Sequence, residues 1–209
     1  MSPGELREYL GPIDVYLFDQ LVKGRLAPGM RVLDAGCGGG RNLVYLLRHG
    51  FDVHGVDEDA GAIREVRALA AMLAPKLTRE NFTATPIEAM LFAPASFDFV
   101  ICNAVLHFAR GEDHFGAMLS AMSRVLKPGG IFFARLMSTH GVEHLIEPLG
   151  DRLYHLPDGG SPVFLVDEPM LSSLTRIIFD GELLDPIKST IVHSHRTMTT
   201  WVLVKGYLP

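Results

Sequence analysis

A cluster of glycines follows a short apolar segment near the start of the chain and indicates a ligand-binding loop. The apolar segment is Val32-Leu33, and Asp34-Ala35-Gly36-Cys37-Gly38-Gly39-Gly40 comes directly after it. Glycines at the end of a strand let a ligand approach the backbone closely. The dinucleotide fingerprint Gly-x-Gly-x-x-Gly is absent, because its last position, counted from Gly36, is Arg41. The phosphate-loop motif is absent as well, since no Gly-Lys-Ser/Thr follows.

Two acidic residues indicate which ligand this loop takes. Asp34 stands just before the glycines, where a carboxylate repels a pyrophosphate and attracts a cationic group. Asp57 ends the next apolar segment, 21 residues after Gly36. Its carboxylate can accept hydrogen bonds from both hydroxyls of a ribose. We therefore predict a nucleoside that carries an amino-acid tail instead of phosphates.

The elements that must position these residues alternate between strands and helices. Apolar segments predict strands at 31–35, 51–56, 81–85, 97–102 and 131–136, with helices at 41–49, 59–73 and 112–126 between them. This alternation is typical of βαβ units and a parallel sheet with helices on both faces. Residues 187–194 and 197–205 predict an antiparallel hairpin at the sheet edge. The expected fold class is α/β, a doubly wound Rossmann-like sheet that is mostly parallel and seven-stranded, with a C-terminal antiparallel hairpin.

We expect one domain built from four parts. Residues 1–29 form an N-terminal helical cap, with a break at Gly11-Pro12, and residues 30–137 form the cofactor-binding core. Residues 138–166 read as a long loop, which is unusual in a compact domain and indicates a substrate lid or insertion. Residues 167–209 supply a helix at 168–180 and the hairpin. Asp59 is the expected N-cap of the helix at 59–73, and Lys127-Pro128-Gly129-Gly130 a helix stop and turn.

Four motifs in register resemble the class I S-adenosylmethionine-dependent methyltransferases. They are Leu33-Asp34-Ala35-Gly36-Cys37-Gly38, Val56-Asp57, Ser96-Phe97-Asp98-Phe99-Val100 and Leu126-Lys127-Pro128-Gly129-Gly130. The resemblance spans about residues 30–136. Gly40-Arg41-Asn42 together with Gly50-Phe51-Asp52-Val53 is also similar to the tellurite-resistance and thiopurine methyltransferase branch. The resemblance implies that the cofactor is S-adenosylmethionine.

The resemblance also implies roles for the residues that match the glycine loop and the acidic pair. The methionine part of the cofactor would be held by Asp34, Gly36, Cys37 and Gly38, with Asp34 near its amino group. Asp57 would accept from the ribose hydroxyls, and Glu58 would flank the adenine.

Other implied contacts come from later segments. The family often places an acid after the third strand to accept from the adenine amino group, and that position is Pro86 here. The backbone N–H of Ile87 or the side chain of Glu88 is the expected substitute. Asn103 would line the methionine side. Apart from the resemblance, we expect the phenols of Tyr9 and Tyr16, on the N-terminal helix, to close over the cofactor.

The histidines of the chain leave more than one interpretation open. His107 follows the fourth strand and is either a general base or substrate contact, or a packing residue in a strand-to-helix turn. His193 and His195 have a spacing that can bind a metal, but no third ligand is identifiable, and alternation on an edge strand explains them equally. We expect no metal site, and we assign His140, His144 and His155 to the lid. Cys37 and Cys102 are expected to fill tight space and not to act as nucleophiles.

Composition limits the compartment and the partners. The 209 residues are 48% hydrophobic, which is enough apolar material for a sizeable core. The net charge of −5 gives no general attraction to nucleic acid. Two cysteines do not make a disulfide framework, and no signal peptide or membrane span is visible. We expect a cytoplasmic protein.

The predicted reaction is in-line transfer of a methyl group from the cofactor sulfonium to a small-molecule acceptor. Methyltransferases that act on nucleic-acid amines carry Asn/Asp-Pro-Pro-aromatic, whereas this chain has Asn103-Ala104-Val105-Leu106. Apolar residues in 138–166 could cover an acceptor or form a homodimer contact. Two rivals remain: a non-catalytic cofactor-binding or interaction module on the same fold, and a nicotinamide-dependent oxidoreductase, which Arg41 and Asp34 disfavour.

Overall fold

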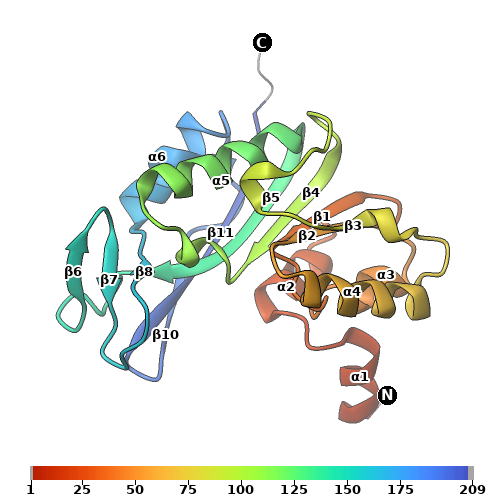
Figure 1. Ribbon diagram of the computed structural model, residues 1–209, viewed down its shortest axis with the longest axis horizontal. Coiled ribbons are helices and arrows are strands. Elements are labelled where there is room, and N and C mark those ends of the chain that lie inside the picture. The colour runs from red at the N-terminus through yellow and green to blue at the C-terminus, as the bar shows by residue number, and fades with distance from the viewer. Residues whose placement is uncertain (1, 207–209) are drawn as a thin grey trace.

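Five parallel strands form the centre of the main sheet in the computed structural model, which describes residues 2–206 (Figure 1). They are β1 (Arg31–Ala35), β2 (Asp52–Asp57), β3 (Phe82–Ala84), β4 (Phe97–Asn103) and β5 (Leu126–Ser138). Strand β11 (Arg196–Val204) runs antiparallel to β5 and pairs with both β10 (Lys188–Val192) and β9 (Glu182–Leu183). The sheet is eight-stranded in the order β10-β11-β5-β4-β1-β2-β3, with β9 beside β11. The predicted α/β sheet and hairpin are confirmed, and β9 is an additional short strand.

The strand order reverses between β1 and β4. From β1 the chain moves to β2 and β3 on one side, and later to β4 and β5 on the other. In open parallel sheets, ligands bind outside the carboxyl ends of the strands at such a reversal. The glycine loop after β1 and Asn103 at the end of β4 flank this point. The fold therefore brings the predicted site segments together.

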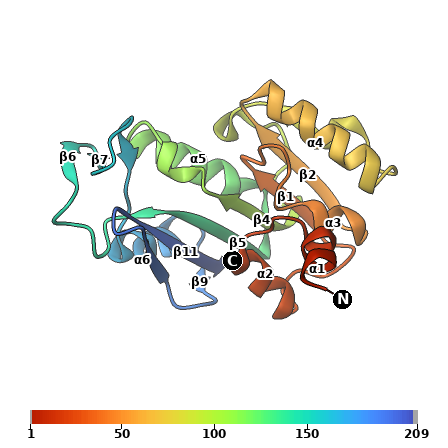
Figure 2. The same cartoon turned by 90° about the horizontal axis from the view of Figure 1, so that it is seen from below.

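Helices cover both faces of the sheet (Figures 1 and 2). They are α1 (Pro3–Leu10), α2 (Val15–Val22), α3 (Val44–Arg48), α4 (Ala60–Leu73), α5 (Glu112–Val125) and α6 (Glu168–Ile177), with short 3₁₀ turns η1 (Arg79–Asn81), η2 (Ile87–Ala89) and η3 (Leu106–Phe108). Residues of α2, α3 and α4 pack with Phe133 and Val202 on one face of the sheet. Residues of α5 and α6 pack with Phe132 and Trp201 on the other face. No helix within residues 2–206 is long and apolar enough to cross a bilayer.

Two helix boundaries follow from local chemistry. Gly11 separates α1 from α2 with φ of 69°, and a Cβ at this position would lie 2.6 Å from the Cβ of Val44. Asp59 caps α4, because its side chain accepts from the N–H of Gly61 at 2.6 Å. The predicted break at Gly11-Pro12 and the predicted N-cap are both confirmed.

Two predicted boundaries are wrong by a few residues. The helix expected at 41–49 begins only at Val44, because residues 41–43 continue the turn that leaves the glycine loop. Strand β5 already begins at Leu126, which pairs with Phe97, whereas Ile131 pairs with Phe99. The Lys127–Gly130 stretch is therefore an irregularity inside the strand pairing and not a turn before the strand.

The segment 138–166, predicted as a loop, contains a second sheet. Its three antiparallel strands are β6 (Glu147–Gly150), β7 (Leu153–His155) and β8 (Val163–Phe164). Asp151 and Arg152 adopt left-handed φ values of 52° and 56° and make the turn between β6 and β7. The Arg152 guanidinium binds the carbonyl of Leu165 at 3.1 Å and pairs with Asp167. Polar turn residues here connect very short strands, which the sequence pattern does not distinguish from a loop.

This small sheet is attached to the start of α5. The N–H of Glu112 donates to Asp151 Oδ1 at 3.1 Å. Gly111, with φ of 148°, allows this approach, because a Cβ there would lie 2.0 Å from Asp151 Oδ2. Asp151 thus supplies the first turn of α5 with the cap that Gly111 has no side chain to give.

Candidate functional site

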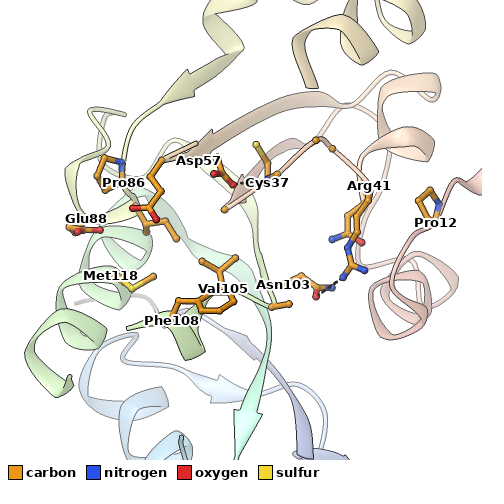
Figure 3. Close-up of a pocket in the computed structure, with 18 of the residues that line it drawn as sticks. Pro12, Cys37, Arg41, Asp57, Pro86, Glu88, Asn103, Val105, Phe108 and Met118 are labelled. Carbon is orange, nitrogen blue, oxygen red and sulfur yellow. Dashed lines mark hydrogen bonds between the residues drawn. The ribbon is translucent and has the colours of Figure 1, made fainter. Parts of the chain in front are cut away.

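A cavity of about 820 Å³ opens at the carboxyl ends of β1, β2 and β4 (Figure 3). Figure 3 places Pro86 and Glu88 towards one end of it and Arg41 and Pro12 towards the other. Its wall consists of Pro12, Gly36, Cys37, Gly38, Gly39, Gly40, Arg41, Asn42, Val44, Asp57, Glu58, Leu69, Pro86, Ile87, Glu88, Asn103, Ala104, Val105, Phe108, Arg110, His114 and Met118. Most of the predicted site residues therefore share one cavity.

The Asp57 carboxylate is fixed by the backbone on both of its oxygens. The N–H of Gly38 donates to Oδ2 at 2.8 Å, and the N–H of Asp59 donates to Oδ1 at 2.9 Å. Each carboxylate oxygen can accept a further hydrogen bond. Asp57 is thus held in place before any ligand arrives, and it joins the glycine loop to the end of β2.

Gly36 sits where the loop meets the segment after β4. Its φ is 81°, and a Cβ there would lie 2.4 Å from a methyl carbon of Val105. Ala104, the residue before Val105, also has a left-handed φ of 63°. Such conformations in residues other than glycine are uncommon and often lie at functional sites. The loop and the β4 segment therefore approach each other closely across the cavity.

Asp34 is a buried carboxylate without a partner. It is only 1% exposed, and neither oxygen has a hydrogen-bond partner among the described residues. Burial raises the pKa of Asp34 to about 7, while the nearby Arg41 opposes this shift and Asp57 adds to it. Asp34 does not form part of the cavity wall itself. A cation reaching it would relieve the cost of burying this group.

A hydrogen-bonded group stands at the other end of the cavity. His114 Nε2 lies 3.0 Å from Glu88 Oε1, and His114 Nδ1 accepts from the N–H of Arg110 at 3.0 Å. Because Nδ1 accepts, the ring proton is on Nε2 and is donated to Glu88. Burial alone would raise the pKa of Glu88, but hydrogen bonds from its own backbone N–H and from His114, with the Arg110 charge, hold the pKa below its usual value. Glu88 is therefore an ionised and oriented acceptor beside Pro86.

The cavity unites eight of the predicted cofactor residues and leaves two aside. Those in the wall are Gly36, Cys37, Gly38, Asp57, Glu58, Ile87, Glu88 and Asn103. Asp34 lies beneath the loop. Tyr16 is turned away, because its hydroxyl bonds to Thr190 Oγ1 at 2.8 Å and its ring lies 4.8 Å from the Arg135 guanidinium.

His107 does not line the cavity. The η3 turn directs its ring into the protein, where it is 3% exposed, and leaves the neighbouring Phe108 67% exposed at the cavity wall. Burial lowers the pKa of His107 to about 4, and the Arg196 charge adds to this shift. The geometry matches the packing interpretation of this residue and does not favour the general base.

The structure adds site residues that the sequence did not identify. They are Arg41, Phe108, Arg110, His114 and Met118. His114 could have been found as a polar residue in the first turn of the predicted helix at 112–126, at the carboxyl end of the sheet. Burial raises the pKa of both Cys37 and Cys102, as expected for thiols that are inert. In the described part of the chain, no three His, Cys, Asp or Glu side chains are grouped to hold a metal ion.

Comparison with known proteins identifies the central segment. Residues 32–130 match the model of a family described as a methyltransferase domain. Over 105 residues the chain is 35% identical to a ubiquinone biosynthesis O-methyltransferase of Brucella ovis. The aligned segment covers 50% of this chain and 40% of that protein. The chain spans less than half the length of the curated relatives it matches.

Solved structures agree on the fold. A Burkholderia thailandensis 1,6-didemethyltoxoflavin-N1-methyltransferase, with its substrate and S-adenosylhomocysteine bound, superposes with a TM-score of 0.69 at 24% identity, over 92% of this chain and 76% of that one. A [4+2]-cyclase superposes equally well, with a TM-score of 0.69 at 18% identity, over 91% and 81% of the two chains. At such identities the likeness defines the fold alone, and one fold carries more than one reaction.

The reversed strand order, the glycine loop and the carboxylate at the end of β2 define a nucleoside-binding α/β domain. Together with the family match, they identify residues 32–130 as a methyltransferase domain with the class I S-adenosylmethionine-dependent methyltransferase fold.

Proposed function

We propose that the protein transfers a methyl group from S-adenosylmethionine to a small-molecule acceptor. One observation carries the proposal: the backbone-held Asp57 carboxylate lines a cavity at the glycine loop, and the unpartnered Asp34 carboxylate is buried directly beneath that loop. The tellurite-resistance or thiopurine branch, the cytoplasmic location and a homodimer remain predictions.

The residues present suit this cofactor at each of its parts. The ribose hydroxyls would donate to Asp57, and the ammonium group of the methionine part would give Asp34 the cation that it lacks. Ile87 and the oriented Glu88 lie beside Pro86, where the adenine edge is expected. Arg41, whose guanidinium bonds to Asn103 Oδ1 at 3.2 Å, would face the methionine carboxylate.

When bound, the sulfonium supplies an activated methyl group with a neutral leaving group, so the protein needs only to align the acceptor and exclude water. With His107 buried outside the wall, the Asn103 end of the cavity offers Pro12, Arg41 and Asn42, and none of these is a general base near neutral pH. The proposed acceptor is therefore one that is nucleophilic without help from a protein base.

The size of the cavity favours catalysis over cofactor binding alone. At about 820 Å³ it lies in the upper part of the range of roughly 300–1,000 Å³ typical of small-molecule sites. A non-catalytic binding module is the second candidate, since one fold hosts different functions, as the [4+2]-cyclase of the same fold illustrates for a different reaction.

The test is calorimetric titration with S-adenosylmethionine and with S-adenosylhomocysteine. Micromolar binding of both is expected, followed by transfer of a labelled methyl group to members of a panel of small thiols, oxyanions and phenols. Absence of binding by folded protein would refute the proposal. Binding without transfer to any acceptor would support the non-catalytic module.

A further inference from the structure

Buried polar atoms without hydrogen-bond partners gather at one place in the molecule. Of eight such side-chain atoms in residues 2–206, six belong to Asp34, Asn103, His107, Arg135 and Thr200. These residues lie towards the carboxyl ends of β1, β4 and β5, in the turn after β4, and opposite Arg135 on β11. Folded proteins pair nearly all such groups, so a cluster of them points to a missing ligand.

Three of these residues form a row across adjacent strands. Asn103 is the register partner of Arg135, and Arg135 is the register partner of Thr200. Residues directly opposite each other share a face of the sheet with their Cβ atoms about 5 Å apart. Phe133 and Val202, two positions away on β5 and β11, belong to the core cluster that includes Leu17 of α2. The row therefore faces α2.

The unpaired atoms of the row are mainly donors. They are Asn103 Nδ2, Arg135 Nε and the Thr200 hydroxyl. The two nitrogens can only donate, and the hydroxyl can donate or accept. A ligand that satisfies all three must offer hydrogen-bond acceptors.

The row adjoins the end of the cavity that lies away from the proposed adenosine contacts. Asn103 belongs to the cavity wall together with Pro12, Arg41 and Asn42, while Asp57 and Glu88 lie towards the other end. Along the edge of the sheet, β3 and β2 carry the adenosine contacts and β1 the methionine contacts. Asn103 at the end of β4 stands at the boundary of the methionine part, and the positions over β5 and β11 are left for a second molecule.

Two guanidinium groups lie at this end, and each has a carboxylate near it. Arg135 Nη1 pairs with Asp14 Oδ2 at 2.5 Å, and Asp14 in turn is held by Asn42, whose Oδ1 accepts from its N–H at 3.0 Å. Arg41 bonds to the amide oxygen of Asn103 and lies near the buried Asp34. The Tyr16 ring covers Arg135, whose side chain remains 18% exposed. The buried charged donor that stays unpaired at this end is therefore Arg135 Nε.

We propose that Asn103, Arg135 and Thr200 bind an anionic group of the methyl acceptor, and that the acceptor is a small molecule carrying a carboxylate or another oxyanion. This inference rests on the proposed function and specifies its substrate class. An oxyanion accepts from all three donors, of which Arg135 Nε is charged, whereas a neutral apolar acceptor leaves the donors unpaired. Tyr16 is the side chain that has to cover the bound acid or move aside for it.

The experiment measures binding to the protein saturated with S-adenosylhomocysteine. The probes are matched acids and amides: benzoate with benzamide, 4-hydroxybenzoate with 4-hydroxybenzamide, and thioglycolate with 2-mercaptoacetamide, titrated by ligand-observed NMR. At least one acid is expected to bind about tenfold or more tightly than its amide, as a charged hydrogen-bonded contact permits.

Two matched variants separate this role from a structural one. Thr200→Val removes an unpaired hydroxyl, so the ligand-free protein should melt about 1–3 °C higher while the acid binds roughly three- to tenfold more weakly. Thr199→Val is the control: its hydroxyl is paired with Ser138 Oγ at 2.6 Å, so it should lower the melting temperature and leave acid affinity unchanged.

The outcomes distinguish this inference from the proposed function. If S-adenosylhomocysteine binds but no acid is preferred over its amide, the inference is overturned and the proposed function stands. The same holds if Thr200→Val leaves the preference for the acid intact. If S-adenosylhomocysteine fails to bind the folded wild-type protein, the proposed function itself falls.

Discussion

The two ends of the cavity differ in how their polar groups are satisfied. At the β2–β3 end, Asp57 accepts from two backbone N–H groups and Glu88 from His114. At the other end, Asn103 in the wall and, behind it on β5 and β11, Arg135 and Thr200 each keep an unpaired atom. The polar groups at the first end are therefore hydrogen-bonded without a ligand. Those at the second end would be fully hydrogen-bonded only when the proposed acceptor binds. The motifs that resemble the family account for Asp57 and the glycine loop at the first end, whereas Glu88 with His114 and the whole of the second end are features of this chain.

The largest expected effect breaks the preformed end. Asp57→Ala should weaken binding of S-adenosylhomocysteine by roughly two orders of magnitude, because two hydrogen bonds to a charged group, each worth about 1.5 kcal/mol, are lost. Calorimetry measures this. Asp52→Ala, at the opposite end of β2 and 48% exposed, should leave the affinity unchanged. If wild type and Asp57→Ala bind S-adenosylhomocysteine with equal affinity, the assignment of Asp57 to the ribose is wrong.

A second effect concerns the proton on Asp34. Burial raises the pKa of this carboxyl to about 7, and an ammonium group nearby favours its charged form. Cofactor binding near pH 7 should therefore release up to about half a proton from Asp34, and Asp34→Asn should remove this release and weaken binding about tenfold. Calorimetry in buffers of different ionisation enthalpy counts the protons. An unchanged proton count in the variant would contradict the assignment.

The same carboxyl sets a pH dependence of stability without ligand. Its folded pKa lies above the unfolded value of 3.8, so it weakens the folded state progressively as the pH rises from about 4 through 7. Asp34→Asn should therefore melt higher than wild type above pH 7, with the difference fading towards pH 4. A difference that grows towards acid pH would show the opposite sign and contradict the buried, unpartnered carboxylate.

A smaller effect tests the adenine end. His114→Asn should free Glu88 and weaken binding of S-adenosylhomocysteine about three- to tenfold, since an oriented hydrogen bond contributes roughly 1 kcal/mol. Glu88→Gln should have a comparable effect. Calorimetry checks both variants, and Glu112→Gln, on the same helix turn, is the control. If neither variant weakens binding, Glu88 does not contact the adenine, and the Ile87 N–H is the remaining candidate.

The smallest effect is expected at His107. Because its ring is buried outside the cavity wall, His107→Asn should change kcat/KM for methyl transfer by less than about threefold, apart from any loss of stability. The rate should be measured against pH, with the melting temperature as the control for folding. A loss of about a hundredfold or more in a folded variant would restore the general-base interpretation.

The sequence predicts the shared end of this cavity well and the other end poorly. Asp57 and the glycine loop are adjacent through one βαβ unit, so their spacing along the chain fixes their geometry. Arg135 and Thr200 are 65 positions apart and meet only because β11 inserts antiparallel to β5. Tyr16 was expected at the cofactor but covers Arg135, since the direction of a side chain on a short helix depends on packing.

Two contacts of different kinds join the small sheet of residues 147–164 to α5. The Asp151 carboxylate caps the helix at Gly111, which leaves room for it, and the Phe164 ring stacks on Phe115 at 4.5 Å, while Arg152 and Asp167 close the base of the sheet. For protein engineering, the 156–162 loop can be redesigned while these six residues are kept. Replacing Gly111 with a bulkier residue would instead force the small sheet away from the helix that carries His114.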